Sequence, residues 1–138
     1  MSRKSQGIKA ERDLYHMLWE RGFAVVRVAG SGCMVEPSCD LLAGNGTIRV
    51  AIECKTTRDK KKYIEKKQME DFKLFSQKFG LNPVVAIKFV RNGWWFIHPE
   101  QLEDTGKNFA ISLEEIRKIG KSLEGFAGSS PEMPEQKI

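Results

Sequence analysis

The sequence has few of the residues that build disulfide frameworks and zinc sites. Among 138 residues there are three cysteines and two histidines, and no two cysteines form a Cys-x-x-Cys pair. A disulfide scaffold or a zinc finger needs more such residues at closer spacing, so the sequence disfavours both. The residues are Cys33, Cys39, Cys54, His16 and His98.

Long apolar segments are also missing. No apolar run approaches the ~20 residues that a membrane-spanning helix needs. Residues 1–7 lack the apolar stretch of a secretory signal peptide. We therefore expect a cytoplasmic protein with reduced thiols and no membrane contact.

The composition fits one folded domain. Hydrophobic residues make up 41% of the chain and charged residues 30%, and a chain of this length usually folds around a single core. We expect a domain over residues 1–124 and a disordered tail over residues 125–138, where Gly, Ser, Pro and charged residues dominate. Whether the tail contacts another protein is left open.

The charge is unevenly distributed. Residues 1–68 hold 14 Lys and Arg against 8 Asp and Glu, a net charge of +6, whereas residues 69–138 hold 9 against 10. The whole positive surplus therefore lies in the first half of the chain. Such an asymmetry indicates a polyanionic partner, either nucleic acid or an acidic membrane.

Periodicity and turn residues predict a mixed sheet flanked by helices. The crossover through the second helix should make at least one pair of strands parallel. The expected helices cover residues 7–21, 64–79 and 113–119; the expected strands cover residues 23–28, 39–43, 47–55, 84–90 and 94–97; residues 56–62 are expected to form a basic loop.

Four polar residues stand apart from this apolar pattern. Glu11 lies on the apolar stripe of the first helix, Asp40 opens one strand of a predicted hairpin, and Glu53 and Lys55 share a face of its partner strand. Carboxylates brought together on a sheet repel each other unless a cation lies between them. Oxygen ligands suit Mg²⁺ or Mn²⁺, which can activate water and neutralise a phosphodiester oxygen. Lys55 would orient the attacking water or stabilise transition-state charge.

The pattern Asp40…Glu53-Cys54-Lys55 resembles the core motif of the PD-(D/E)xK nuclease superfamily. Further segments resemble the archaeal Holliday-junction resolvase family over roughly residues 3–120. These are residues 7–12 at the start of the first helix, residues 22–27 after it, Ser31 in a Gly-Ser-Gly loop, and Gln68 on the second helix.

The resemblance implies a restriction-endonuclease-like α/β fold, in which a mixed β-sheet is flanked by helices. It also implies a structure-selective endonuclease of DNA recombination and repair, which nicks opposing strands of a four-way junction as a homodimer. Carried onto this sequence, it makes Glu11, Asp40 and Glu53 ligands of Mg²⁺, with Mn²⁺ as a substitute. Lys55 becomes the catalytic lysine, and Ser31 the active-site serine of a mobile loop.

Seven residues are candidates for contact with DNA. The resemblance implies such contacts for Arg12 and Arg27, which match basic positions of the family. Gln68, which is part of the same resemblance, is also a candidate. The dense basic run that follows Lys55 is expected to contact phosphates, because it adjoins the candidate site in the basic half. Its candidate residues are Arg58, Lys60, Lys61 and Lys62.

Three aromatic residues are candidates for a dimer interface. Phe72 and Phe79 lie on a stripe of the second helix that packs either on the chain's own sheet or on a second subunit. Trp94 and Trp95 point to opposite faces of one strand, so one is expected to be buried and the other to be an anchor for a partner. We assign Phe72, Phe79 and Trp94 to the interface.

Two other interpretations stay open. The chain could be another PD-(D/E)xK nuclease that acts on duplex DNA, or a non-catalytic DNA-binding module of the same fold. Ser31 could also be part of an ordinary glycine loop without chemistry.

Overall fold

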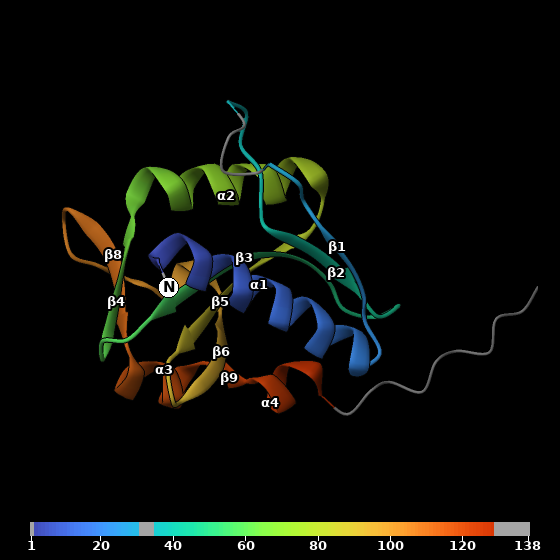
Figure 1. Cartoon of the computed structure of the whole chain (residues 1–138). Helices are drawn as coiled ribbons and strands as arrows, with labels where there is room; N and C mark the ends of the chain where they lie inside the picture. The colour runs from blue at the N-terminus through green and yellow to red at the C-terminus, as the bar shows by residue number, and fades with distance from the viewer. Residues whose placement is uncertain (1, 31–34, 129–138) are drawn as a thin grey trace, which may run out of the picture.

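The computed structural model describes residues 2–30 and 35–128. This part of the chain contains a six-stranded sheet in the order β1-β2-β3-β5-β6-β9 and a three-stranded sheet in the order β4-β8-β7. Helices cover both faces of the larger sheet (Figure 1), which confirms the predicted fold class. The elements are α1 (Arg3–Glu20), β1 (Ala24–Arg27), β2 (Leu41–Gly44), β3 (Arg49–Thr57), β4 (Lys61–Glu65), α2 (Lys66–Phe79), β5 (Asn82–Phe89), β6 (Gly93–Ile97), η2 (Pro99–Gln101), β7 (Glu103–Asp104), β8 (Asn108–Ser112), α3 (Leu113–Ile119), β9 (Lys121–Ser122) and α4 (Leu123–Ala127).

Strand β3 lies in the middle of the larger sheet. It pairs antiparallel with β2 and parallel with β5. The crossover through β4 and α2 returns the chain to the end at which β3 began, so β5 runs in the same direction as β3. This confirms the predicted parallel pair. β6 and β9 then extend the sheet with antiparallel pairs.

Alternating side chains of the central strands build two separate cores. Val50 and Ile52 of β3 pack with α1 and α4 on one face, in a cluster that includes Leu14 and Leu18. The next side chain, Ala51, points to the other face, where α2 and α3 pack. This two-residue period matches the predicted alternation along β3. No helix in the described ranges is long and apolar enough to cross a membrane.

Helix α1 begins at Arg3 rather than at Gly7. Ser2 is its N-cap, and the Ser2 hydroxyl accepts the main-chain N–H of Ser5 at 3.1 Å. Gly7 therefore lies inside the helix, where a glycine costs about 1 kcal/mol relative to alanine. The expected start at residue 7 is wrong because the cap supports an additional turn before this glycine.

The basic stretch after Lys55 is mostly strand rather than loop. β3 continues to Thr57, and β4 starts at Lys61. Ile64, expected in the second helix, lies in β4, where it pairs with Phe109 and is buried. The expected loop over residues 56–62 is therefore wrong, because a distant strand, β8, pairs with this segment.

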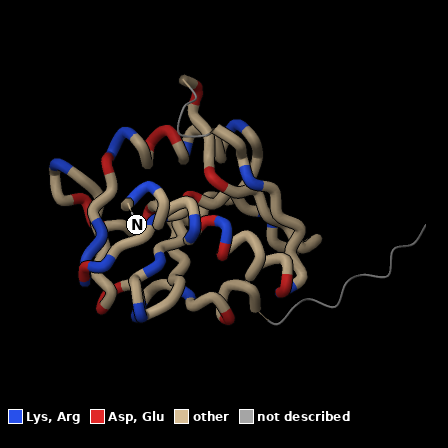
Figure 2. The backbone as a smooth tube through the Cα atoms, in the orientation of Figure 1, with Lys and Arg blue, Asp and Glu red and all other residues tan. Residues whose placement is uncertain are grey.

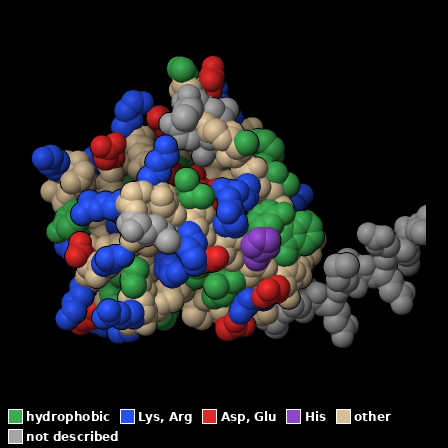
Figure 3. All heavy atoms as spheres, viewed as in Figure 1, with side chains coloured by type: hydrophobic (Ala, Val, Ile, Leu, Met, Phe, Trp, Pro, Cys, Tyr) green, Lys and Arg blue, Asp and Glu red, His purple; other side chains and the backbone are tan. Residues whose placement is uncertain are grey.

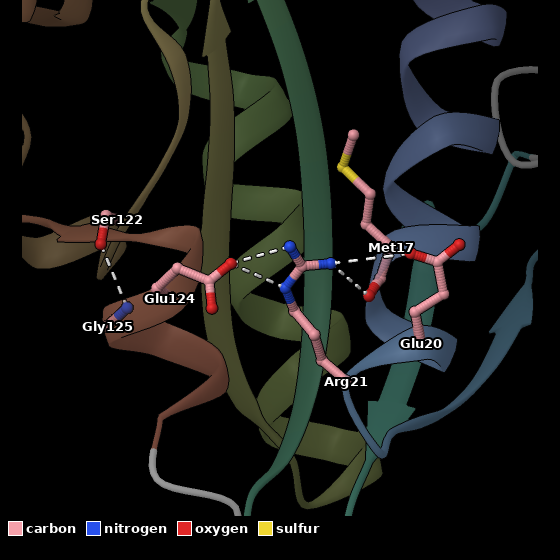
Figure 4. Close-up of polar contacts among 6 residues, drawn as sticks. All are labelled: Met17, Glu20, Arg21, Ser122, Glu124 and Gly125. Atoms are coloured by element: carbon pink, nitrogen blue, oxygen red, sulfur yellow. Dashed lines mark hydrogen bonds and ion pairs between the residues drawn. The ribbon is translucent and has the colours of Figure 1, made fainter.

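The last described helix, α4, extends past the expected domain boundary at residue 124. Phe126 is buried between Phe23 and Phe96, with ring centroids 5.7 and 4.4 Å away. Figure 4 shows how Arg21, at the end of α1, reaches α4: its Nε and Nη2 donate to Glu124 Oε1 at 3.0 and 2.7 Å. The domain thus extends to at least Ala127, and residues 129–138 of the expected tail lie outside the described part.

Replacement of Phe126 by alanine tests this packing. Phe126→Ala removes a buried ring that contacts two others, so we expect the free energy of unfolding to fall by about 3 kcal/mol. Urea denaturation followed by circular dichroism measures the change. The exposed Val35→Ala variant, at a side chain that is 96% exposed, should change it by less than ~0.5 kcal/mol. Equal effects in the two variants would contradict the packing role of α4.

Candidate active site at the β2–β3 hairpin

The turn between β2 and β3 sets the register of the hairpin. Asn45 Oδ1 accepts the main-chain N–H groups of Thr47 and Ile48 at 3.0 and 2.6 Å. This side chain replaces a main-chain acceptor and fixes the turn. In the resulting register, Leu41 lies opposite Ile52.

Asp40, the residue before β2, continues the pairing with β3 in the same register. Its main-chain N–H donates to the Ile52 carbonyl at 3.1 Å, and its Oδ2 accepts the N–H of Cys54 at 2.8 Å. The Asp40 carboxylate is therefore held beside the middle of β3. Glu53 lies there with only 7% of its surface exposed, so the strand pairing brings the two acidic side chains together.

The environment of Glu53 strongly favours its protonated form. Burial, followed by a hydrogen bond with Asp40 and the charge of Asp40, raises the pKa of Glu53 to about 9. Burial and Asp40 also raise the pKa of Glu11. The carboxyl groups thus repel one another, and the nearby cations Lys55 and Arg27 offset only part of the rise in pKa.

Glu11 reaches this region from α1. Its Oε1 lies 3.2 Å from Arg27 Nε of β1, and this contact works against the rise in the Glu11 pKa. Only 18% of the Glu11 side chain is exposed, so the ion pair is largely shielded from water. Arg27 therefore fixes the carboxylate that the sequence placed on the apolar stripe of the helix.

Lys55 lies two residues after Glu53 on the same face of β3. Its Nζ donates to Gln68 Oε1 at 2.7 Å. Gln68 belongs to the first turn of α2, which covers this face. The amide holds the ammonium group in place without neutralising its charge.

A small cavity opens beside these side chains. It has a volume of about 160 Å³ and includes Asp40, Glu53 and Gln68 in its wall. Asp71 lines it as well, three residues after Gln68 on α2 and 3.1 Å from Lys67 Nζ. The sequence did not single out Asp71, although its spacing from Gln68 places both on one side of the helix.

The acidic side chains fit a hard divalent cation by their chemistry. Their oxygen atoms are the ligands that Mg²⁺ prefers. The pKa of Glu53 is raised first by burial and then by Asp40, and a cation beside the two carboxyl groups would favour their charged forms. Within residues 2–30 and 35–128, no three His, Cys, Asp or Glu side chains are arranged to enclose an ion. Asp40 and Glu53 are already adjacent, whereas Glu11 would have to turn from Arg27 to join them.

A larger basic cavity of about 600 Å³ adjoins Lys55 on the side of α1. We call it the inner basic cavity; it is lined by Arg3, Gln6, Gly7, Cys54, Lys55, Thr56, Thr57, Arg58, Asp59 and Lys62. Burial, and then the charges of Lys55 and Arg3, lower the pKa of Lys62. The cations repel one another here, and Figure 2 shows Lys and Arg positions gathered on this side of the molecule.

Arg3 is a second residue that the sequence did not single out. It lines the inner basic cavity because α1 starts at Arg3. Two features of the sequence could have identified Arg3. Ser2 is a possible helix cap, and two cations follow it in the first turn of the helix, where acidic residues are favoured. An unfavourable charge at this position indicates a role outside helix stability.

The predicted DNA contacts do not form one cluster. Arg58 and Lys62 line the inner basic cavity, but Lys60 lines a different one. Lys61 Nζ lies 3.4 Å from Glu103 of β7. Arg12 and Arg27 line a separate hollow between α1 and β1. The predicted catalytic residue Ser31 lies outside the described residues.

Two of the three predicted interface residues are buried in the chain's own core. Phe72 is 1% exposed and Trp94 is 5% exposed, so neither presents a surface to a second subunit, and these two assignments are wrong. The apolar stripe of α2 and the alternation of β6 put both residues in the cores of the single chain. Phe79, by contrast, is 58% exposed.

The ionisation of Glu53 can be tested by stability. The folded-state pKa of about 9 lies above the ordinary value of 4.5, so the unfolded chain loses its proton first and unfolding becomes easier as pH rises between these values. We expect Glu53→Gln to stabilise the metal-free protein by about 1–3 kcal/mol at pH 8 and by little near pH 4.5. Urea unfolding at several pH values measures the difference. A difference that is independent of pH would contradict the assignment.

Comparisons with known proteins show the family to which the chain is similar. The family model described as archaeal Holliday junction resolvase (hjc) matches residues 2–133. The crossover junction endodeoxyribonuclease Hjc of Archaeoglobus fulgidus is 40% identical over 125 residues, which cover 91% of each chain. Hjc of Methanocaldococcus jannaschii is 42% identical over 115 residues, covering 83% of this chain and 80% of that relative.

A solved structure gives the same result for the fold. The structure of A. fulgidus Hjc, a Holliday junction resolvase, superposes with a TM-score of 0.81 at 38% identity. The match covers 88% of this chain and all of that one. The family suggested by the acidic pattern and its flanking segments is therefore confirmed: the chain belongs to the archaeal Holliday junction resolvase family.

Proposed function

We propose that this protein is a structure-selective endodeoxyribonuclease that resolves Holliday junctions in recombination and repair by Mg²⁺-dependent hydrolysis. The observation that carries the proposal is the juxtaposition of Asp40 and Glu53 with Lys55, which Gln68 holds in place. This constellation lies beside a basic cavity. It occurs in a chain whose relatives are named crossover junction endodeoxyribonucleases.

Asp40 and Glu53, joined by Glu11, are the side chains that would hold Mg²⁺ or Mn²⁺. When bound, the ion supplies a Lewis acid that polarises the phosphodiester and lowers the pKa of a water molecule. The protein's own contribution is to hold the carboxylates in register through the Asp40–Cys54 hydrogen bond. Glu53, whose pKa is raised to about 9, would have to lose its proton to serve as a ligand.

Lys55 is positioned to act on the reacting group. Its ammonium is fixed by Gln68 at 2.7 Å, which leaves further N–H donors available, since an ammonium has three. One of them can orient the attacking water or donate to a phosphate oxygen as negative charge develops. Gln68 is then a positioning residue, because it acts through Lys55.

The substrate would be recognised by its backbone and shape. The inner basic cavity offers Arg3, Arg58 and Lys62 next to Lys55, and guanidinium and ammonium groups bind phosphates without reading bases. Arg12 and Arg27 supply further cations in the hollow between α1 and β1, where Arg27 also pairs with Glu11. Lys60 and Lys61 extend the basic surface along the start of β4.

We further propose that the active form is a homodimer. Two opposing strands of a four-way junction must be cut, and one chain carries one such constellation, so a two-fold pair of chains matches the substrate. Phe79 remains the interface candidate, since it lies exposed at the end of α2 with its ring centroid 5.4 Å from that of Phe75.

Replacement of Asp40 tests the catalytic assignment. Asp40→Asn removes a metal-binding charge but keeps an oxygen that can accept the Cys54 N–H, so the fold should persist. We expect junction cleavage to fall by about three orders of magnitude. Junction affinity measured without divalent metal should be unchanged or slightly higher, because one negative charge is lost.

The matched control is Asp13→Asn on α1. Asp13 forms a surface ion pair with Lys9 at 3.1 Å, so its loss should leave cleavage within about threefold. Unchanged cleavage in Asp40→Asn, or equal loss in both variants, would refute the role of Asp40.

Substrate choice and salt dependence test the junction assignment. With Mg²⁺ and equimolar four-way junction and linear duplex, we expect preferential cleavage of the junction. Junction affinity should fall steeply with salt, by about 10³-fold or more between 50 and 200 mM, if six or more phosphates are contacted. Preferential duplex cleavage would favour a duplex nuclease of the same superfamily, and an affinity insensitive to salt would refute recognition through the backbone.

A further inference from the structure

A second basic cavity lies on the far side of the turn between β3 and β4. It has a volume of about 660 Å³ and is bounded by this turn, by the turn between β5 and β6, and by α3. We call it the outer basic cavity; it is lined by Arg58, Asp59, Lys60, Val90, Arg91, Asn92, Leu113 and Arg117. The catalytic constellation includes none of these residues, and only Arg58 and Asp59 also line the inner basic cavity.

The walls of this cavity are fixed by main-chain hydrogen bonds on both sides of the β3–β4 turn. The Thr57 carbonyl accepts the Val90 N–H at 3.0 Å, and the Lys60 carbonyl accepts the Leu113 N–H at 2.7 Å. The short turn is therefore tied to the end of β5 and to the start of α3. A cavity with such walls needs little ordering when a ligand binds.

The cationic side chains of the cavity are also partly positioned. Arg117 Nη2 donates to Asn92 Oδ1 at 2.8 Å, which orients the guanidinium without neutralising it. Arg91 has a φ of +71°, a left-handed conformation that glycine or asparagine adopts more easily. The chain thus carries an arginine at a position where the backbone favours a smaller residue.

Positive charge dominates the outer basic cavity. Four of its residues are cationic and only Asp59 is acidic. Among the described ion pairs, none involves Lys60, Arg91 or Arg117. The charges therefore remain available for an external anion. Its apolar lining is limited to Val90 and Leu113, which offers little to an apolar side chain of a protein partner.

Arg58 connects this cavity to the catalytic region. It lines the inner basic cavity beside Lys55, the outer basic cavity, and a third hollow of about 310 Å³ with Lys9 and Lys88. Figures 1 and 3 show the β3–β4 turn next to α3 at the lower left of the view, with Lys and Arg side chains spread over this part of the face. A polyanion that leaves the inner cavity past Arg58 would reach the outer one.

We propose that the outer basic cavity binds backbone phosphates of the DNA substrate outside the cleaved site, with Arg91 and Arg117 as the contacting residues. The proposal rests on the proposed function for the identity of the polyanion as DNA. Its independent support is the fixed, charged cavity and its continuity with the inner one through Arg58. The cavity thereby holds a part of the junction that the catalytic constellation does not reach.

The test removes the two arginines together. Arg91→Asn keeps a residue that tolerates positive φ, and Arg117→Gln keeps a good helix former. Junction affinity is measured without divalent metal over a range of salt concentrations. Loss of two phosphate contacts should reduce the slope of log K against log salt by about 1.8 and weaken binding about 10- to 30-fold near 0.15 M salt.

A matched double variant controls for net charge. Arg49→Gln with Lys78→Gln also removes two exposed cations, at the start of β3 and near the end of α2, and neither residue lines the inner or outer basic cavity. Circular dichroism confirms that both double variants are folded. The control should change the slope by less than half as much. Equal effects in the two double variants would overturn the proposal.

Neutral methylphosphonates at single positions of the junction locate the contact. With the unaltered chain, some substitutions outside the cleaved site should weaken binding; with Arg91→Asn and Arg117→Gln, the same substitutions should have no further effect. If each methylphosphonate weakens binding by the same factor in the double variant as in the unaltered chain, the outer basic cavity is not the cause of these losses, and the proposal is overturned. If the unaltered chain cleaves no junction, the proposed function fails; if it cleaves and the double variant binds as the control does, only the outer cavity fails.

Discussion

The close approach of Asp40 and Glu53 is the constraint on which the site depends. Two carboxyl groups in a largely buried position destabilise the metal-free chain, and the structure tolerates them because the β2–β3 register and the Cys54 N–H hold Asp40 in place. Burial, and then the hydrogen bond and the charge of Asp40, favour the protonated form of Glu53. A bound cation would instead stabilise the charged form of both carboxyl groups. The hairpin, the covering helix α2 and the amide of Gln68 all serve to keep that small region in one arrangement.

Much of the central sheet could be predicted from sequence because its signals are local. The Gly-Asn-Gly turn and the alternation along β3 fixed the hairpin, and Gly80 marked the end of α2. The errors arose where distant segments decide the structure. Ile64 lies in β4 because β8 pairs with it, and Phe126 is ordered because it packs between two rings from other elements. No short window of sequence contains either partner.

The residues of the candidate site show the same difference between local sequence signals and contacts of distant segments. Asp40, Glu53 and Lys55 could be grouped from one hairpin, since strand alternation alone puts them on neighbouring positions. The inner basic cavity could not, because it joins the first turn of α1 to the end of β3. The apolar stripe of α2 was also ambiguous: periodicity identified a buried face, but it cannot tell a chain's own core from a subunit interface. In the structure, Phe72 is buried in the chain's own core, whereas Phe79 is exposed.

The position of β3 between β2 and β5 has a consequence for the mobility of the site. Both edges of this strand are hydrogen-bonded, so its main-chain amides become accessible to solvent only when much of the sheet separates. Glu53 and Lys55, which lie on β3, therefore share the cooperativity of the whole fold. Local opening is expected at the rims, where turns and helix ends surround the cavities. Heating would leave Glu53 and Lys55 in place until the domain itself unfolds, and adjustment to a bound partner would occur at the surrounding surface.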